Sequence, residues 1–259
     1  MTIKVKTAST ERKLKALMPV KFKSVIASML QSALAGNLIK KSGVRFNMFG
    51  GYFDYSLVSN TEAAQIFFGI WESAEIRFSK RFARNKNIVE LGSCIGVTLG
   101  VLGNKFINTH FTCVEANPTN YEVLKIIAGQ VSPKNTVSLI NKAIAYTDDM
   151  VVFNQTTTSG SKLADNNFTP GNLIKIKSVT LSKLLKDENI NGPFTLISDI
   201  EGTEENIFFE DADALKNCNK IICELEGTRS NSIESQVLQL KNLNFILIER
   251  YGNVFYFRK

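Results

Sequence analysis

The stretch Ile88-Val-Glu-Leu-Gly-Ser-Cys-Ile-Gly96 runs from an apolar segment into a loop with two glycines, and a helical pattern follows it. This order predicts a strand, a tight turn and a helix. Glycine lets the backbone approach a ligand closely, and the start of the helix would face a polar group. Glu90 lies near the end of the strand, where its carboxylate can meet an ammonium group. A purely structural turn would have the same form, so the glycines alone leave both interpretations open.

Strands and helices alternate outward from this turn. The pattern predicts strands at 87–91, 110–115, 137–144, 151–155, 174–179, 194–200, 220–225, 245–249 and 254–258. It predicts helices at 96–106, 118–130, 181–189, 204–215 and 232–243. Such alternation indicates an α/β fold, with a mostly parallel sheet covered by helices on both faces. The closing hairpin should add one antiparallel strand at or near an edge.

The chain before residue 87 has a different pattern. Apolar residues at helical spacing predict helices at 20–39 and 61–82, the second with Thr61 as its N-cap. Between them, the segment 46–55 combines aromatic residues with two glycines and predicts either a bend that carries rings or a turn in the core. We therefore expect a basic, mainly helical extension over residues 1–86 and an α/β domain over residues 87–259.

Positive charge is concentrated at the N-terminus. Residues 1–41 hold nine Lys and Arg and one acid, whereas the other 218 residues hold 22 bases and 23 acids. A basic segment attracts phosphate, nucleic acid or an anionic membrane, although it can also be a solvated tail. The chain has no run of about 18 apolar residues, so we expect no transmembrane helix. We expect a cytoplasmic protein, in peripheral contact with the inner face of the membrane through residues 1–41.

Cysteine and histidine offer little for metal chemistry. The four cysteines form no Cys-x-x-Cys pair, and His110 is the one histidine. We therefore expect no metal site and reduced cysteines in the core, as in a reducing compartment. His110 begins a predicted strand, at the end away from the expected pocket, so a general base would have to be a carboxylate.

The segment His110-Phe-Thr-Cys-Val-Glu115 is an apolar strand that ends in an acid. In a doubly wound sheet this strand lies beside the first, and Glu115 could accept both hydroxyl groups of a ribose. A dinucleotide site would also need Gly-x-Gly-x-x-Gly, but Cys94 and Val97 occupy two of the glycine positions. The pattern favours a cofactor with a nucleoside and no pyrophosphate.

Several segments resemble the FkbM-type methyltransferases over residues 88–226. They are Val89-Glu-Leu-Gly-Ser-Cys-Ile-Gly96, Val114-Glu-Ala-Asn-Pro118, Asn141-Lys-Ala-Ile144, Val179-Thr-Leu-Ser-Lys-Leu-Leu185 and Ser198-Asp-Ile-Glu-Gly-Thr-Glu204. The last, similar to the family's Lys-x-Asp-x-Glu-Gly-x-Glu, is the most specific. The departures from the family pattern keep every carboxylate; they are Glu90 for Asp, Ser93 for Ala, Cys94 for Asn, Ala116 for Pro and Ser198 for Lys.

The resemblance implies a class I, Rossmann-like methyltransferase with a mostly parallel seven-stranded sheet and a C-terminal antiparallel hairpin. It implies S-adenosyl-L-methionine as the methyl donor and a hydroxyl acceptor, often on a sugar of a glycan such as lipopolysaccharide O-antigen, which is sometimes lipid-linked. By the same resemblance, Glu115 would hold the ribose, and other residues would complete the cofactor site. These are Glu90, Gly92, Ser93, Gly96, Ala116, Asn117, Ala143 and Asp199.

Asp199 and Glu201 lie at the carboxyl end of the strand predicted at 194–200, where ligands of open α/β sheets collect. They could orient a sugar and take its proton, and Glu224 could line the same mouth. We expect one of the first two acids to be functional and the other to cap the helix that begins near Thr203. The alternatives are a methyltransferase of another small hydroxylated molecule and an RNA methyltransferase-like protein. Because the excess charge is confined to one segment, we expect no nucleic acid partner.

Overall fold

The computed structural model describes residues 32–147, 149–155, 162–163, 172–228 and 230–259. The chain divides into two compact units, each described here by itself. The smaller unit comprises residues 1–44 and 55–71, and the larger comprises residues 45–54 and 72–259. The predicted boundary between an N-terminal extension and the α/β domain at residue 86 stays a prediction. Most of the N-terminal bases lie outside the described residues, as does most of the helix predicted at 20–39.

The smaller unit contains helices α3 (Ala33–Ser42) and α4 (Asn60–Phe67) and the short helix η1 (Tyr55–Leu57). The backbones of α3 and α4 approach closely, because a Cβ added at Gly36 would lie 1.6 Å from the carbonyl oxygen of Asn60. Ser59 begins α4 with a capping box, in which Ser59 and Glu62 bind each other's backbone amides.

The single helix predicted at 61–82 is wrong, and so is its N-cap. The segment forms α4 and, in the larger unit, α5 (Ser73–Phe82). Helix α4 ends at Phe67, and Gly69 follows with a left-handed φ of 64° that a helix cannot contain. Apolar spacing continued across the break and hid it. Thr61 lies within the first turn of α4, and Ser59 is the cap.

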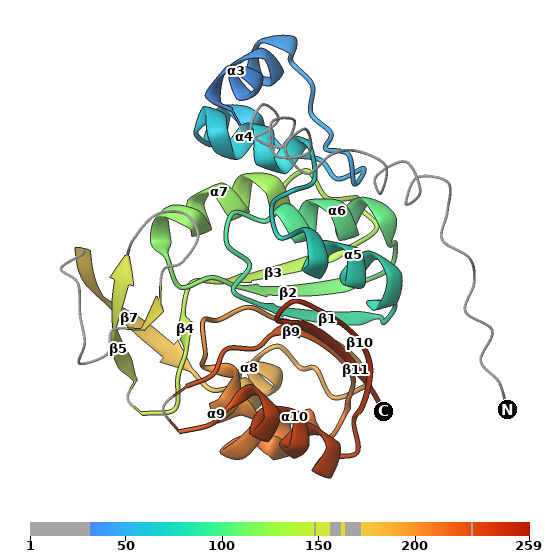
Figure 1. Cartoon of the computed structure of the whole chain (residues 1–259), viewed down its shortest axis with the longest axis vertical. Helices are drawn as coiled ribbons and strands as arrows, with labels where there is room; N and C mark the ends of the chain where they lie inside the picture. The colour runs from blue at the N-terminus through green and yellow to red at the C-terminus, as the bar shows by residue number, and fades with distance from the viewer. Residues whose placement is uncertain (1–31, 148, 156–161, 164–171, 229) are drawn as a thin grey trace, which may run out of the picture. The chain divides into compact units, whose positions relative to one another are not determined.

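The larger unit is built on a sheet whose described strands have the order β10-β11-β9-β8-β1-β2-β3 (Figure 1). Their bounds are β1 (Asn87–Leu91), β2 (His110–Val114), β3 (Thr136–Ile140), β8 (Phe194–Ser198), β9 (Cys218–Glu224), β10 (Ile246–Tyr251) and β11 (Val254–Arg258). Strand β11 runs antiparallel to both of its neighbours, and the remaining pairs are parallel. The prediction of a mostly parallel seven-stranded α/β sheet that closes with an antiparallel hairpin is confirmed.

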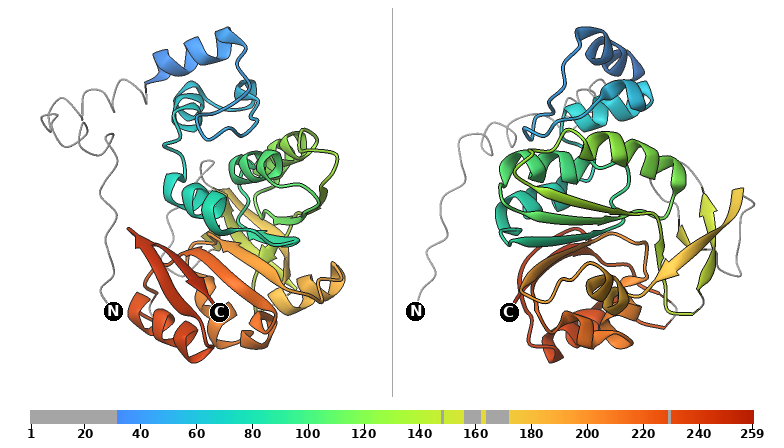
Figure 2. Two further views of the ribbon diagram at one scale, coloured as in Figure 1. Left: turned by 90° about the vertical axis from the view of Figure 1, so that its right-hand side faces the viewer. Right: turned by 180° about the vertical axis from the view of Figure 1, so that it is seen from behind.

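Helices cover both faces of this sheet (Figures 1 and 2). Helices α5, α6 (Val97–Lys105) and α7 (Pro118–Ala128) cover one face. The other face is covered by α8 (Leu181–Asp187), α9 (Glu204–Phe209), α10 (Ile233–Asn242) and the short helix η2 (Ala212–Leu215). Alternate residues of β1 supply the two cores, with Ile88 in the first and Val89 and Leu91 in the second. Alternation places Glu90 on the same face as Ile88.

A second, smaller sheet has the strand order β4-β7-β5-β6. Its strands are β4 (Ala143–Ile144), β5 (Met150–Gln155), β6 (Lys162–Leu163) and β7 (Asn172–Val179). The sequence predicted one strand over 137–144, but the chain leaves the large sheet after Ile140. The side-chain amide of Asn141 donates there to the carbonyl oxygens of Glu115 and Ala116, at 2.8 and 3.2 Å. Polar residues between two apolar runs marked this break.

The segment 45–54 turns back on itself, where the sequence had left open a bend that carries rings or a turn in the core. Phe46 and Tyr52 make an antiparallel bridge, and the Asn47 side chain accepts hydrogen bonds from the amides of Phe49 and Gly51. Gly51 is required because a Cβ there would lie 2.4 Å from a side-chain carbon of Val101. Within the described part of the chain, no helix has the length and hydropathy that a membrane span needs.

We expect the substitution Ser59→Ala to destabilise the protein and Thr61→Ala to have little effect. Loss of an N-cap hydroxyl costs about 1 kcal/mol, because amides of the first helical turn lose their acceptor. Exposed Thr61 supplies no such cap. Urea unfolding followed by circular dichroism measures both changes. A larger loss with Thr61→Ala would contradict the assigned helix start.

Candidate cofactor and acceptor site

The glycine loop, residues 92–96, follows β1 and lies at the carboxyl ends of β1, β2 and β8. The amides of Gly92 and Ser93 both donate to the carbonyl oxygen of Val114, each at 2.9 Å. Gly92 has a φ of 80°, and a Cβ there would lie 2.0 Å from the carbonyl oxygen of Asp199. The loop after β1 therefore touches the loop after β8 through backbone alone. Gly96, with a φ of 80°, begins α6.

Glu115 follows β2 and ties the site together. One carboxylate oxygen accepts from the amide of Cys94 at 2.7 Å, and the other accepts from the amide of Asn117 at 2.6 Å. Each oxygen can accept more than one hydrogen bond, so these bonds leave capacity for ligand hydroxyl groups. Burial raises the pKa of Glu115 to about 7, although its backbone hydrogen bonds act in the opposite direction. Glu115, which is predicted to bind the ribose, thus also supports the glycine loop.

Ala116, Asn117 and Ala143 lie beside Glu115 in different ways. Ala116 and buried Ala143 share an apolar cluster with Val151, Phe153 and other residues of the small sheet. This cluster offers an apolar wall of the kind that a nucleobase needs. Asn117 is the N-cap of α7 and accepts from the amide of Thr119 at 2.9 Å. Its side chain is therefore engaged at least in part with the helix.

Glu90 lies one residue before the end of β1 and is 4% exposed. Burial, followed by the nearby charge of Glu72, raises the pKa of Glu90 to about 8. Its carboxylate accepts a hydrogen bond from the Cys113 thiol at 3.5 Å. A carboxylate in this setting gains stability when a cationic group arrives, because the cation offsets the lost solvation.

Asp199, Glu201 and Glu224 come together at the ends of β8 and β9. Burial is the main cause of the raised pKa of Asp199, and the charges of Glu72, Glu204, Glu224 and Glu201 add to it. Burial also raises the pKa of Glu224. The acids predicted to bind the acceptor are thus neighbours. Glu90, Glu72 and Glu75 lie close enough for their charges to act on one another and on these acids.

The loop after β8 is secured by Glu204, an acid that the sequence did not single out, and the cap expected from Asp199 or Glu201 stays a prediction. One Glu204 oxygen accepts from the Ser198 hydroxyl at 3.0 Å and the Ile200 amide at 2.7 Å. The other accepts from the Gly202 amide at 3.0 Å. Glu204 is 1% exposed and is the first residue of α9, where Thr203 provides no side-chain cap. Its position at the start of a helix was a usable signal in the sequence.

Sequence reasoning missed two acids at the start of α5, which are Glu75 in its first turn and Glu72 at its N-cap. Glu75 is buried on the face that also carries Ile76, Phe78 and Ser79, and it accepts from the Thr98 hydroxyl at 3.4 Å. Burial raises the pKa of Glu75, and the charges of Glu72, Asp199, Glu90 and Glu224 raise it further. An acid on the apolar face of an amphipathic helix was the signal available in the sequence.

Backbone strain gathers at the same edge. Apart from glycine and asparagine, the described residues with left-handed φ are Glu72 (44°), Cys94 (48°) and Glu201 (55°). Such conformations cost free energy in residues with a Cβ and are concentrated at functional sites. All three border the acidic cluster, as the charges acting on Asp199 and Cys94 show.

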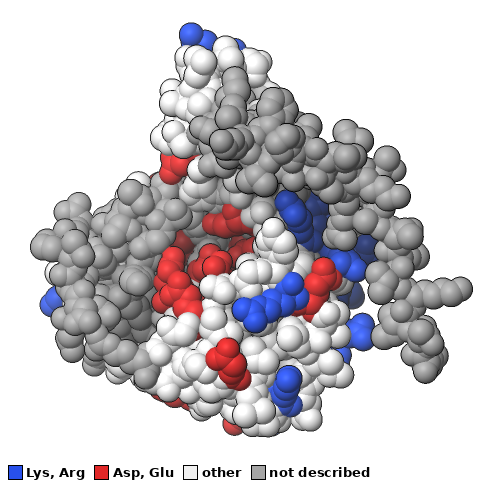
Figure 3. All heavy atoms as spheres, in the orientation of Figure 1, with Lys and Arg blue, Asp and Glu red and all other residues white. Residues whose placement is uncertain are grey.

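Figure 3 shows acidic side chains gathered in a hollow over the carboxyl ends of the sheet. Among the described residues, no group of His, Cys, Asp and Glu is arranged to hold a metal ion. The acidic side chains of the hollow favour a ligand that carries positive charge. A sulfonium with an ammonium group meets that description.

His110 and the cysteines lie apart from this chemistry. His110 begins β2 at the opposite edge, and its Nε2 lies 3.0 Å from the Ser138 hydroxyl. All four cysteines are free, and burial raises the pKa of each thiol. Cys94 lies in the glycine loop, where its sulfur accepts from the Asn120 amide at 3.6 Å. The thiols therefore stay protonated at neutral pH.

Comparison with protein-family models matches residues 92–254 to the methyltransferase FkbM domain. A search of curated protein sequences found no match. Similar solved structures include a Pyrococcus furiosus methyltransferase (12% identity, TM-score 0.41, 71% of this chain and 81% of that chain). They also include Aeropyrum pernix fibrillarin with bound S-adenosyl-L-methionine (9%, 0.43, 72% and 74%) and a Synechocystis magnesium protoporphyrin IX methyltransferase (9%, 0.43, 76% and 81%). The matched family domain begins in the glycine loop and ends in the closing hairpin, so it spans nearly the whole site.

We expect the ligand-free protein to lose stability as pH rises from 6 to 8. The folded-state pKa of Glu90 is about 8, above its ordinary value, so the folded form keeps the proton that the unfolded chain releases. The stabilisation that this proton uptake provides is complete below the pKa of Glu90 in the unfolded chain. It is lost as pH rises through the pKa of Glu90 in the folded protein. Glu90→Gln removes this titration and should flatten the slope by up to about 1.4 kcal/mol per pH unit.

Denaturant unfolding at several pH values tests this dependence. Glu122→Gln is the matched control, because Glu122 lies in α7 with an exposed carboxylate that pairs with Lys125. The same pH slope in both variants would show that Glu90 is not held neutral in the fold.

Proposed function

The chain belongs to the FkbM methyltransferase family, and from that premise we propose that it methylates a hydroxyl group on a sugar of a surface glycan, such as lipopolysaccharide O-antigen. It is an S-adenosylmethionine-dependent methyltransferase with a class I α/β fold. The observation that carries the proposed acceptor is the set of carboxylates at the ends of β8 and β9, which adjoin the glycine loop through the contact of Gly92 with Asp199.

The residues around the glycine loop fit the cofactor. Glu115 adjoins both the loop and the apolar wall of Ala116 and Ala143, as a ribose that carries a flat aromatic base would require. Glu90 is a buried carboxylate whose raised pKa makes a cationic ligand favourable. When bound, S-adenosylmethionine supplies an electrophilic methyl group on a sulfonium.

Asp199 is the carboxylate that we assign as proton acceptor. Burial raises the pKa of Asp199, so the ligand-free side chain keeps its proton, and the positive charge of the bound cofactor would favour the ionised form that can accept the proton of a sugar hydroxyl. Glu201 and Glu224 would accept hydrogen bonds from further hydroxyl groups and so orient the ring. Sugars present several adjacent hydroxyl donors, and a group of carboxylates satisfies such donors well. Holding donor and acceptor in line supplies a large part of the rate enhancement.

The acids at this edge disfavour RNA as the acceptor. A polyanion would bring phosphates close to Asp199, Glu201 and Glu224, and like charges repel strongly where solvent screening is poor. The same carboxylates would tolerate another small neutral molecule with hydroxyl groups. The carboxylates alone do not distinguish a sugar from such a molecule, so the test must use the glycan itself.

We expect Glu115→Ala to weaken S-adenosylhomocysteine binding more than tenfold, because hydrogen bonds to a charged group contribute about 1.5–3 kcal/mol. Calorimetry on the purified protein measures the affinity, with Glu122→Ala as the control. The 2′-deoxy analogue separates ribose recognition from support of the loop: wild type should prefer the hydroxylated ligand, and the variant should not. A variant that keeps this preference would contradict the ribose assignment.

We expect Asp199→Asn to lower kcat at least about a hundredfold while cofactor affinity changes only a few-fold, as for loss of a general base. The assay uses labelled S-adenosylmethionine and glycan from cells that lack the gene, followed by mass spectrometry for one added methyl group on one sugar. Asp187→Asn, in exposed surroundings at the end of α8, is the control. Label in the RNA fraction instead of the glycan would refute the proposed substrate.

A further inference from the structure

The edge of the large sheet opposite the site carries a group of cations. A hollow of about 930 Å³ there is lined by Arg84, Lys86 and Lys105 together with residues that begin β1 and precede β2. A neighbouring groove of about 350 Å³ shares Arg84 and Lys105. We call these cations the basic edge; they are Arg77, Lys80, Arg81, Arg84, Lys86 and Lys105.

Little negative charge offsets the basic edge. Within the described residues, the carboxylate within 4 Å of one of these six side chains is Glu249, which pairs with Arg81 at 2.7 Å. Lys80 and Lys105 instead donate to the carbonyl oxygens of Phe49 and Lys80, respectively. Burial, followed by the charges of Lys80 and Arg84, lowers the pKa of Lys105. The cations therefore repel one another and would be stabilised by an anionic surface.

Exposed apolar side chains accompany these cations. Ile107 lines the larger hollow and is 57% exposed. Phe49 lines the groove, and its neighbour Met48 is 69% exposed. Cations combined with protruding apolar groups are typical of surfaces that lie in a lipid interface, where headgroups meet the charges and acyl chains meet the apolar groups. A surface that binds single-stranded nucleic acid also needs the cations, but its apolar contacts are typically aromatic rings that stack on bases and not exposed Met and Ile.

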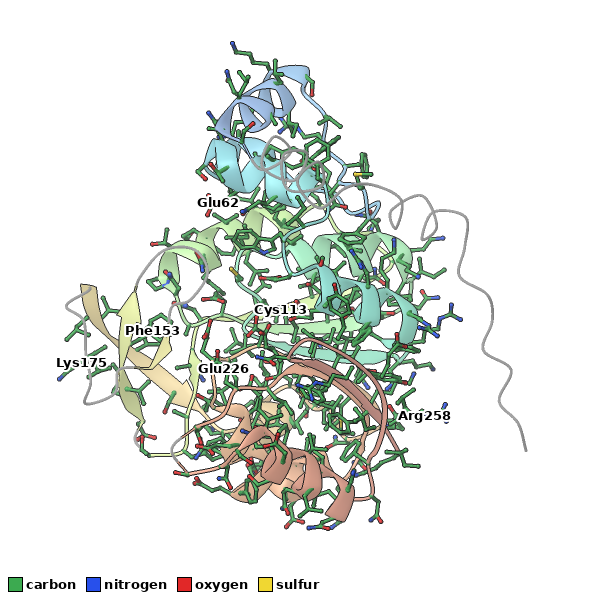
Figure 4. All side chains as sticks on the ribbon, in the orientation of Figure 1. Glu62, Cys113, Phe153, Lys175, Glu226 and Arg258 are labelled. Atoms are coloured by element: carbon green, nitrogen blue, oxygen red, sulfur yellow. The ribbon has the colours of Figure 1, made fainter. Side chains whose placement is uncertain are left out.

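Helix α5 separates the two functions in space. Its N-cap is Glu72, its first turn carries Glu75, and its last turn carries Lys80 and Arg81. Figure 4 shows the same separation across the sheet, with Glu226 near the acidic edge and Arg258 at the opposite edge. A bilayer at the basic edge would therefore leave the acidic site facing away from it.

We propose that the basic edge, with Met48 and Ile107, binds the headgroup region of an anionic lipid bilayer and holds the enzyme there with its site turned toward the aqueous phase. The surface lies in the larger unit alone and does not depend on residues 1–31. It adds a second contact to the one expected from the N-terminal bases, most of which lie outside the described residues. The proposal stands independently of the sugar acceptor.

Co-sedimentation of the full chain with vesicles tests the proposal. We expect binding to phosphatidylcholine vesicles that contain phosphatidylglycerol and none to phosphatidylcholine alone. The triple variant Arg77→Ser, Arg84→Ser, Lys86→Ser should bind at least about tenfold more weakly, because each of these cations contributes near the surface. Binding should also fall with salt, since the screening length shortens from about 10 Å at 0.1 M to about 3 Å at 1 M.

The control variant Lys183→Ser, Lys186→Ser, Lys241→Ser removes the same charge from α8 and α10 and should bind as the wild type does. Equal loss in both triple variants would overturn the proposal, because net charge alone would then explain binding. It would also be overturned if the Arg77, Arg84, Lys86 variant kept full binding while serine substitution of the bases in residues 4–23 abolished it.

Two further arms test the occupant. Met48→Ser combined with Ile107→Ser should reduce the vesicle binding that persists at high salt. If this salt-resistant binding is unchanged in the double variant, the apolar contact is refuted. A single-stranded RNA should bind more weakly than the anionic vesicles and should not displace them. RNA that binds more tightly, and whose binding is lost in the Arg77, Arg84, Lys86 variant, would make the basic edge a nucleic-acid surface.

Discussion

The site depends on buried carboxylates that accept hydrogen bonds from backbone amides. Glu115 binds the amides of Cys94 and Asn117 and so joins the glycine loop to the start of α7. Glu204 binds the amides of Ile200 and Gly202 and fixes the loop after β8 in the same way. Between them, the missing side chain of Gly92 lets the two loops touch through the Asp199 carbonyl. Two loops without regular structure are thereby fixed by hydrogen bonds to buried side chains.

This construction concentrates acids where water is scarce. Glu75, Glu90, Asp199 and Glu224 all have raised pKa values, with burial as the leading cause in each. A lone buried carboxylate avoids its charge by keeping a proton, and a cationic ligand removes the need for that proton. The ligand-free protein thus stores unfavourable electrostatics that a sulfonium and an ammonium would relieve. The strained backbone at Glu72, Cys94 and Glu201 lies at the same edge.

Helix α5 shows how one element can serve both edges of a sheet. Its position is fixed by apolar packing, including Phe78 in the core and Phe82, whose ring stacks on Tyr256 at 4.0 Å. Because the helix lies between the two edges, the acids at its start and the cations at its end fall on opposite sides of the larger unit. The orientation also agrees with the helix dipole, which favours acids at the start and bases at the end.

The sequence alone determined the features that depend on local pattern. Alternating strands and helices specified the parallel sheet, the closing hairpin specified its antiparallel strand, and the glycine loop with Glu115 and Asp199 marked the ligand edge. The sequence pattern did not predict the break between α4 and α5, because apolar spacing indicates which face is buried and not whether the helix continues through Gly69. Only the tertiary structure decided that Glu72 and Glu75 join the site, that Glu204 secures the loop, and that β4 to β7 form a separate sheet. These outcomes depend on which distant segments pack together, since burial and the field of neighbouring charges belong to the folded arrangement and not to any stretch of chain.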